Sequence, residues 1–111
     1  MLYAQDPSTI PAAYDLATKA RKALPDDPEV AALLGRLSYE KKEYPRAVQL
    51  FQESARKRPL DANSFFYLGM SQLQARQTAE ARGALNQALT GGLQEPLAAE
   101  AKRALADIQK E

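Results

Sequence analysis

Apolar residues recur at intervals of three and four positions along most of the chain, as Ala81, Leu85 and Ala88 illustrate. This spacing places them near one face of an α-helix, and no stretch shows the apolar and polar alternation of a half-buried strand. Proline, glycine and acidic residues interrupt the pattern and divide it into short segments. The sequence therefore predicts an all-α chain of antiparallel helical hairpins, with helices over residues 10–23, 28–42, 45–58, 62–75, 78–90 and 96–109.

The ends of these predicted helices carry residues that stabilise helix termini. Asp27 precedes Pro28, and a proline costs little in a first helical turn because its missing N–H has no partner there. Asp61 stands before the next predicted helix, where a carboxylate accepts hydrogen bonds from free backbone N–H groups. Gly91 and Gly92 follow a later helix, and glycine adopts the left-handed conformation that ends a helix.

Residues of similar size return after 34 positions, although few of them are identical. Gly35 falls on Gly69, and Ala47 falls on Ala81. We expect these small residues to let the two helices of a hairpin approach closely, and a large side chain at any of the four to push the helices apart. The repeated signature comprises Leu34, Gly35, Tyr44, Ala47, Phe51 and Pro59, followed by Leu68, Gly69, Ala81, Leu85 and Ala88.

A helix-turn-helix unit of 34 residues with this signature resembles the tetratricopeptide repeat. The chain departs from the family pattern at Leu93, where a proline would fall, and at Ser38 and Gln72, which replace an aromatic residue. The resemblance implies hairpins stacked as a short right-handed α-solenoid. It divides the chain into a partial repeat over residues 1–27, full repeats over 28–61 and 62–95, and a C-terminal capping helix over 96–111.

The helix predicted over residues 10–23 aligns with the second helix of a hairpin, and residues 1–5 align with the end of a first helix. We therefore expect a C-terminal fragment that is cut inside a repeat of a longer protein. Its first helix would then be partly bare and would invite a homodimer or a neighbouring helix from another chain. The residues expected to be bare are Ile10, Ala13, Tyr14 and Ala17.

The stretch over residues 2–30 is also similar to repeats of large bacterial tetratricopeptide proteins, including those of exopolysaccharide-export and envelope-assembly systems. This similarity implies a parent protein in the cytoplasm or at the envelope, including the periplasm. The sequence alone does not choose between these compartments.

In this family the first helices of successive repeats line a concave face, so the resemblance implies binding of a peptide or partner protein there. Aromatic and guanidinium groups are typical anchors of such surfaces. Phe66, Met70 and Leu73 form one stripe, which would alternatively pack on the terminal helix or on the preceding hairpin. The predicted partner-binding residues are Arg36, Tyr39, Glu40, Asn63, Phe66, Tyr67, Met70 and Leu73.

A second function stays open at this point. The domain would then be a structural segment of a longer solenoid, which assembles or self-associates and carries no ligand in its groove. The two functions differ in whether the first helices or the ends of the array make the contact.

Composition argues against catalysis. The chain has 15 lysines and arginines against 14 aspartates and glutamates, and it contains neither histidine nor cysteine. Imidazole bases, thiol nucleophiles and the usual zinc ligands are therefore absent, while most acidic residues stand at predicted helix ends. We expect a non-catalytic protein that uses no cofactor or metal.

The charge pattern gives no reason to expect nucleic acid or membrane partners. A net charge of +1 supplies little field to attract a phosphate backbone. The basic cluster Arg56, Lys57 and Arg58 occupies a predicted last turn, where cations offset the negative end of the helix dipole. No uncharged stretch approaches the ~20 residues that span a bilayer, so we expect no membrane insertion.

Overall fold

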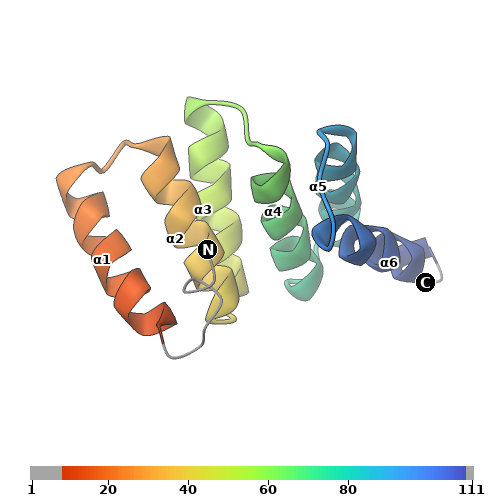
Figure 1. Ribbon diagram of the computed structural model, residues 1–111, viewed down its shortest axis with the longest axis horizontal. Helices are drawn as coiled ribbons and strands as arrows, with labels where there is room; N and C mark the ends of the chain where they lie inside the picture. The colour runs from red at the N-terminus through yellow and green to blue at the C-terminus, as the bar shows by residue number, and fades with distance from the viewer. Residues whose placement is uncertain (1–8, 110–111) are drawn as a thin grey trace. The chain divides into compact units, whose positions relative to one another are not determined.

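The computed structural model describes residues 9–109 and consists of two compact units that divide between Pro59 and Leu60. Unit 1 is the part up to Pro59 and unit 2 the part from Leu60, and each is described by itself (Figure 1). The described residues form six helices and no strand. Unit 1 contains α1 (Ile10–Ala23), α2 (Pro28–Glu40) and α3 (Tyr44–Lys57), and unit 2 contains α4 (Ala62–Gln74), α5 (Thr78–Thr90) and α6 (Leu97–Gln109).

The all-α class and the helical-hairpin organisation predicted from the sequence are confirmed, and every described helix end lies within two residues of its predicted position. The short segments between the helices carry the expected caps. The carboxylate of Asp27 accepts from the backbone N–H of Glu29 at 2.8 Å and of Val30 at 3.3 Å. Asp61 accepts from the N–H of Ser64 at 2.8 Å. Each aspartate thus satisfies donors that have no partner inside the helix.

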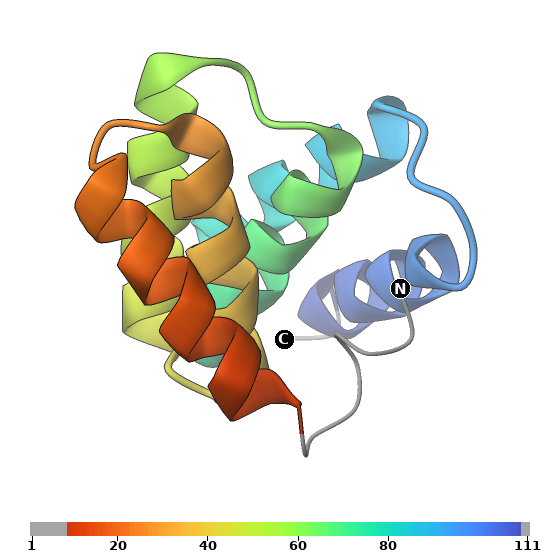
Figure 2. The ribbon, with the colours of Figure 1, turned by 60° about the vertical axis from the view of Figure 1, so that its left-hand side comes forward.

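In unit 1, α2 packs against both α1 and α3, and Figures 1 and 2 show α1 alongside α2. Its core contains Ala17 of α1, Leu34 and Leu37 of α2, and Leu50 of α3. Ala17 and Ile10 are therefore buried. For these two residues the expectation of a partly bare face was wrong, and Ala17 packs against leucines of α2. Ala13 and Tyr14 are only partly buried, against the same core. Residues 1–5, which the repeat aligns with the end of a first helix, lie outside the described residues.

In unit 2, α4 and α5 form a hairpin, and α6 contacts both of these helices. The face of α6 that carries Ala98, Ala101, Ala104 and Ile108 is buried, while Lys102 on the opposite side is exposed. One amphipathic helix thus covers apolar surface of the preceding hairpin and presents charged side chains to solvent.

The turns inside the α2–α3 and α4–α5 hairpins have the same backbone geometry 34 residues apart. Lys42 has φ 64° and Arg76 has φ 65°, both in the left-handed region. The next residue in each turn donates its N–H to a carbonyl near the end of the first helix, Glu43 to Ser38 and Gln77 to Gln72, both at 2.8 Å. The 34-residue period is therefore present in the backbone hydrogen bonds as well as in side-chain size.

Glycine allows the close contact between the helices of each hairpin. A Cβ atom added to Gly35 would lie 3.0 Å from ring carbons of Phe51. One added to Gly69 would lie 2.8 Å from Cγ of Leu85. Ala47, on the helix that faces Gly35, is completely buried. The predicted close approach at these small residues is confirmed.

We predict graded effects of alanine at three helical glycines. Gly83 has no atom within 4 Å of an added Cβ, so Gly83→Ala should raise the free energy of unfolding by about 0.5–1 kcal/mol through helix propensity. Gly69→Ala should lower it by roughly 1–3 kcal/mol, because the branch carbon of Leu85 must move. Gly35→Ala should fall between them, since a ring shift of a few tenths of an ångström suffices. Urea denaturation measures all three, and equal effects at Gly83 and Gly69 would contradict the packing described here.

The left-handed residues give a second prediction. Lys42→Gly and Arg76→Gly should each raise the free energy of unfolding by about 0.5 kcal/mol, because relief of backbone strain exceeds the added freedom of the unfolded chain. The matched control is Lys41→Gly, since Lys41 has φ −83° and carries no such strain. Thermal melts followed by circular dichroism should show stabilisation at the two left-handed positions and destabilisation at Lys41.

Candidate partner-binding surface

The partly accessible side of α2 presents a mixed surface. Leu33 is exposed, and Arg36, Tyr39 and Glu40 are half-buried. The ring of Tyr39 packs edge-on against that of Tyr44 of α3, with centroids 5.8 Å apart and planes at 61°. This contact fixes the direction of an aromatic side chain that remains partly accessible, one helical turn from the guanidinium group of Arg36.

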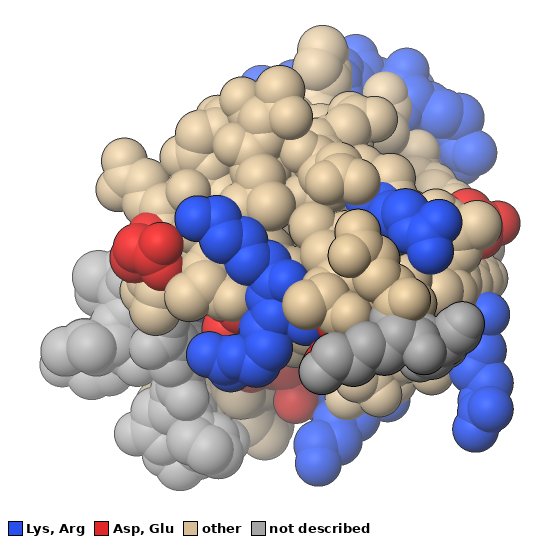
Figure 3. All heavy atoms as spheres, turned by 90° about the vertical axis from the view of Figure 1, so that its right-hand side faces the viewer, with Lys and Arg blue, Asp and Glu red and all other residues tan. Residues whose placement is uncertain are grey.

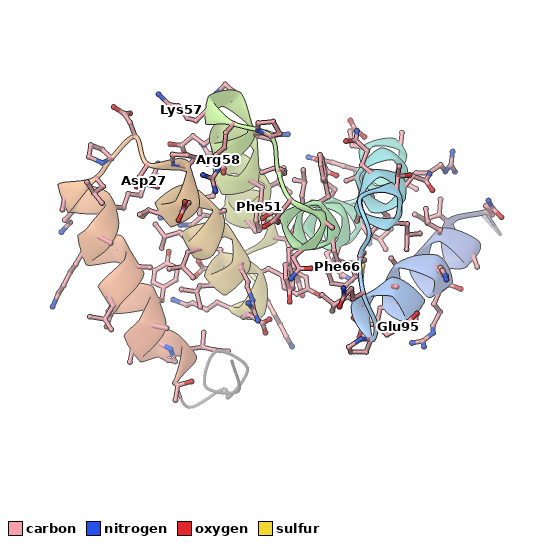
Figure 4. The ribbon with its side chains drawn as sticks, turned by 45° about the horizontal axis from the view of Figure 1, so that its top comes forward. Asp27, Phe51, Lys57, Arg58, Phe66 and Glu95 are labelled. Carbon is pink, nitrogen blue, oxygen red and sulfur yellow. The ribbon has the colours of Figure 1, made fainter. Side chains whose placement is uncertain are left out.

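The predicted binding residues of α4 lie in a different environment. Phe66 is 1% exposed and Tyr67 is 8% exposed, and their rings meet edge-on with centroids 5.2 Å apart. Figure 4 shows Phe66 on the side of α4 toward Glu95, at the start of α6. Asn63 is exposed, whereas Met70 and Leu73 are half-buried. Phe66 and Tyr67 therefore belong to the interior, whereas Asn63, Met70 and Leu73 stay accessible to different degrees.

Unit 1 also contains an aromatic and basic cluster that the sequence patterns did not reveal. Arg46 of α3 donates through Nε to the hydroxyl of Tyr14 of α1 at 2.9 Å. The ammonium nitrogen of Lys41 lies 4.0 Å from the centroid of the same tyrosine ring, a favourable cation–π geometry. Tyr14 stands 27 positions before Lys41 and 32 before Arg46, so no local period brings it to them. The one indication in the sequence is that Tyr14 and Arg46 are separated by nearly one repeat length. The ion pair of Arg21 and Glu53 has the same separation.

Buried polar groups lie inside both units. Ser54 is well satisfied, because its hydroxyl donates to the carbonyl of Pro28 at 2.8 Å and joins α3 to the start of α2. The side-chain oxygens of Ser38, Ser71 and Gln72 are buried and have no hydrogen-bond partner among the described residues. Ser38 and Gln72 stand where the tetratricopeptide pattern has an aromatic residue, so a polar side chain occupies each of these two buried positions.

The basic cluster of Arg56, Lys57 and Arg58 lies at the end of α3, as the sequence predicted. Arg56 and Lys57 are in the last turn of α3. Lys57 lies 4.0 Å from Asp26 and Arg58 lies 3.2 Å from Glu29, and Figure 4 shows Asp27, Lys57 and Arg58 at the same end of unit 1. These exposed pairs contribute little to stability, but they balance the charge locally.

Figure 3 shows a face on which lysine and arginine side chains lie at separate places, with uncharged surface and some acidic side chains among them. Across residues 9–109, no group of three or more acidic side chains is arranged to hold a metal ion. Within the same residues, no helix combines the length and the apolar character needed to cross a bilayer.

Antiparallel helix pairs whose turns, glycines and buried alanines recur after 34 residues define a helical-hairpin repeat protein. A family model described as tetratricopeptide repeat matches residues 10–62 and again residues 66–109. The chain belongs to the tetratricopeptide repeat family. A search of curated proteins gave no match. Proteins of this family generally mediate protein–protein interactions and are typically non-catalytic scaffolds.

The burial of Phe66 predicts a structural role that separates it from Tyr39. Phe66→Ala should lower the free energy of unfolding by about 3–5 kcal/mol, because it leaves a cavity in a closed interior. Tyr39→Ala should lower it by roughly 1 kcal/mol, since a half-buried ring loses less contact. Urea denaturation of the two variants makes the comparison. A stable Phe66→Ala protein would show instead that this ring is an available surface residue.

Proposed function

We propose that this domain is a non-catalytic scaffold that binds a peptide or partner protein through the exposed faces of its first helices, α2 and α4. The observation that carries the proposal is the placement of Tyr39, which Tyr44 holds in one direction beside Arg36. An aromatic ring that is already fixed loses little entropy on binding, so it is a favourable anchor. Asn63, Met70 and Leu73 supply a smaller contact on α4.

The chemistry of these faces favours a ligand of mixed character. On α2 a tyrosine ring, the guanidinium group of Arg36 and the carboxylate of Glu40 stand within two helical turns. On α4 the proposed binding residues that are at least partly accessible are Asn63, Met70 and Leu73, which carry an amide, a thioether and a branched aliphatic group. A peptide with an aromatic or aliphatic residue next to a charged one suits the face of α2, and an apolar or amide-bearing residue suits that of α4. In this arrangement α6 serves as the capping helix of the array.

A displayed library of random dodecapeptides, selected on the intact chain, tests the proposal. Selected peptides should bind Tyr39→Ala at least about tenfold more weakly in fluorescence anisotropy, since an aromatic anchor typically contributes 1–2 kcal/mol or more. Tyr39→Phe should retain most of the affinity, because it keeps the ring. Met70→Ala should weaken binding by a smaller factor.

The matched controls are Gln49→Ala and Gln52→Ala, on the exposed side of α3. Both should bind the selected peptides within twofold of the unchanged protein. Equal affinity of Tyr39→Ala and the unchanged protein, with both folded by circular dichroism, would show that the face of α2 is not the binding surface.

A further inference from the structure

Residues 1–8, called here the N-terminal segment, precede the described part of the chain and are joined to α1, which begins at Ile10. Tyr14, one turn into α1, accepts a hydrogen bond from Nε of Arg46 of α3 at 2.9 Å. The centroid of its ring lies 4.0 Å from the ammonium nitrogen of Lys41, the residue that directly follows α2. The start of α1 therefore lies beside the end of α2 and the start of α3, as Figure 1 also shows.

The same end of unit 1 holds the tyrosine that is proposed above as an anchor. Tyr39 is in the last turn of α2 and packs on Tyr44, the first residue of α3, with ring centroids 5.8 Å apart. Arg46, which contacts Tyr14 of α1, follows Tyr44 by two residues. The N-terminal segment is therefore attached to the fold close to Tyr39.

The partly accessible side of α2 lies within reach of the N-terminal segment. We call this side the α2 face and define it by Leu33, Arg36, Tyr39 and Glu40. Leu33 is 48% exposed and the other three residues are half-buried. With 13 residues, α2 is about 20 Å long. Residues 1–8 span about 26 Å when extended, so they are long enough to follow the α2 face from its end near α1 to Leu33.

The composition of the N-terminal segment suits the α2 face. Its sequence, MLYAQDPS, places a leucine and a tyrosine next to each other and a carboxylate at Asp6. About 13 Å of extended chain separates Asp6 from α1, more than the roughly 8–10 Å between the axes of packed helices, so its carboxylate reaches Arg36. Leu2 and Tyr3 stand further along the chain and reach the exposed side chain of Leu33.

Charge alone does not select this occupant, because the α2 face carries Glu40 as well as Arg36. Attachment to α1 supplies the remaining advantage. A short tether gives an effective concentration of millimolar order. A contact that has a dissociation constant of about 1 mM as a separate peptide is then occupied about half of the time within the chain. A few apolar contacts are therefore sufficient.

We propose that residues 1–8 occupy the α2 face of the same chain and limit the access of a partner peptide to it. Asp6 then pairs with Arg36, while Leu2 and Tyr3 cover the apolar part of the face around Leu33. This inference rests on the proposed function, because the segment and the partner compete for one surface.

The affinity for peptides selected on the intact chain tests the competition. Leu2→Ser together with Tyr3→Ser should strengthen their binding about twofold or more in fluorescence anisotropy, since the apparent affinity is proportional to the fraction of chains with an open face. The matched control is Ala4→Ser together with Gln5→Ser, which adds two serines and keeps both large apolar side chains. It should leave the affinity unchanged. Equal affinities of the first variant and the unchanged protein overturn the proposal.

Nuclear magnetic resonance tests the contact without any partner. Leu2→Ser together with Tyr3→Ser should shift the backbone amide signals of Leu33, Arg36 and Tyr39, because a leucine and an aromatic ring are removed from their surroundings. The signals of Gln49 and Gln52, on the exposed side of α3, should stay in place. Shifts that are confined to residues next to the substitutions overturn the proposal.

Two further comparisons separate the possible outcomes. Shift differences that disappear on dilution place the segment on a second copy of the chain, which also overturns the proposal. Shifts on α2 without any effect of Tyr39→Ala on the selected peptides support the position of the segment and refute the proposed function. Weaker peptide binding by Tyr39→Ala without shifts on α2 refutes only this inference.

Discussion

The close contact between a glycine and a large apolar side chain is the constraint on which each hairpin depends. Gly35 accepts the ring of Phe51, and Gly69 accepts the branched end of Leu85. This contact sets the distance between the helices and the rotation of each helix about its axis, because only the glycine side of the first helix admits so close an approach. Every other residue of α2 and α4 then points in a direction that follows from this choice.

The direction of the remaining residues explains why two equivalent helices offer different surfaces. On α2 the positions beside the core hold a leucine, an arginine and a tyrosine that stay partly accessible. On α4 the positions of Phe66 and Tyr67 are buried, so the aromatic groups contribute to stability rather than to an open surface. Burial of such rings excludes water over a large area, which favours their inclusion in the interior. The same backbone thus leaves Tyr39 partly accessible on one helix and buries Phe66 and Tyr67 on the other.

The candidate site was only partly readable from the sequence. Helical spacing named Arg36, Tyr39 and Glu40 as binding residues; all three are half-buried, and their role in binding stays a prediction. The same reasoning left Phe66 and Met70 undecided, since α4 has two apolar stripes and spacing does not say which of them is covered. The cluster of Tyr14 with Arg46 was also unreadable, because cation and hydrogen-bond partners on different helices follow no local period.

The sequence by itself determined the helices, their ends and the repeat. Helix-forming residues, the carboxylates of Asp27 and Asp61, and the two packing glycines act over a few neighbouring positions, so their effects can be read along the chain. Only the tertiary structure decided which side of α1 is buried, with Ile10 and Ala17 inside and Leu16 exposed. The physical reason is that burial depends on which neighbouring helix is present. A residue's own type and spacing do not specify that neighbour.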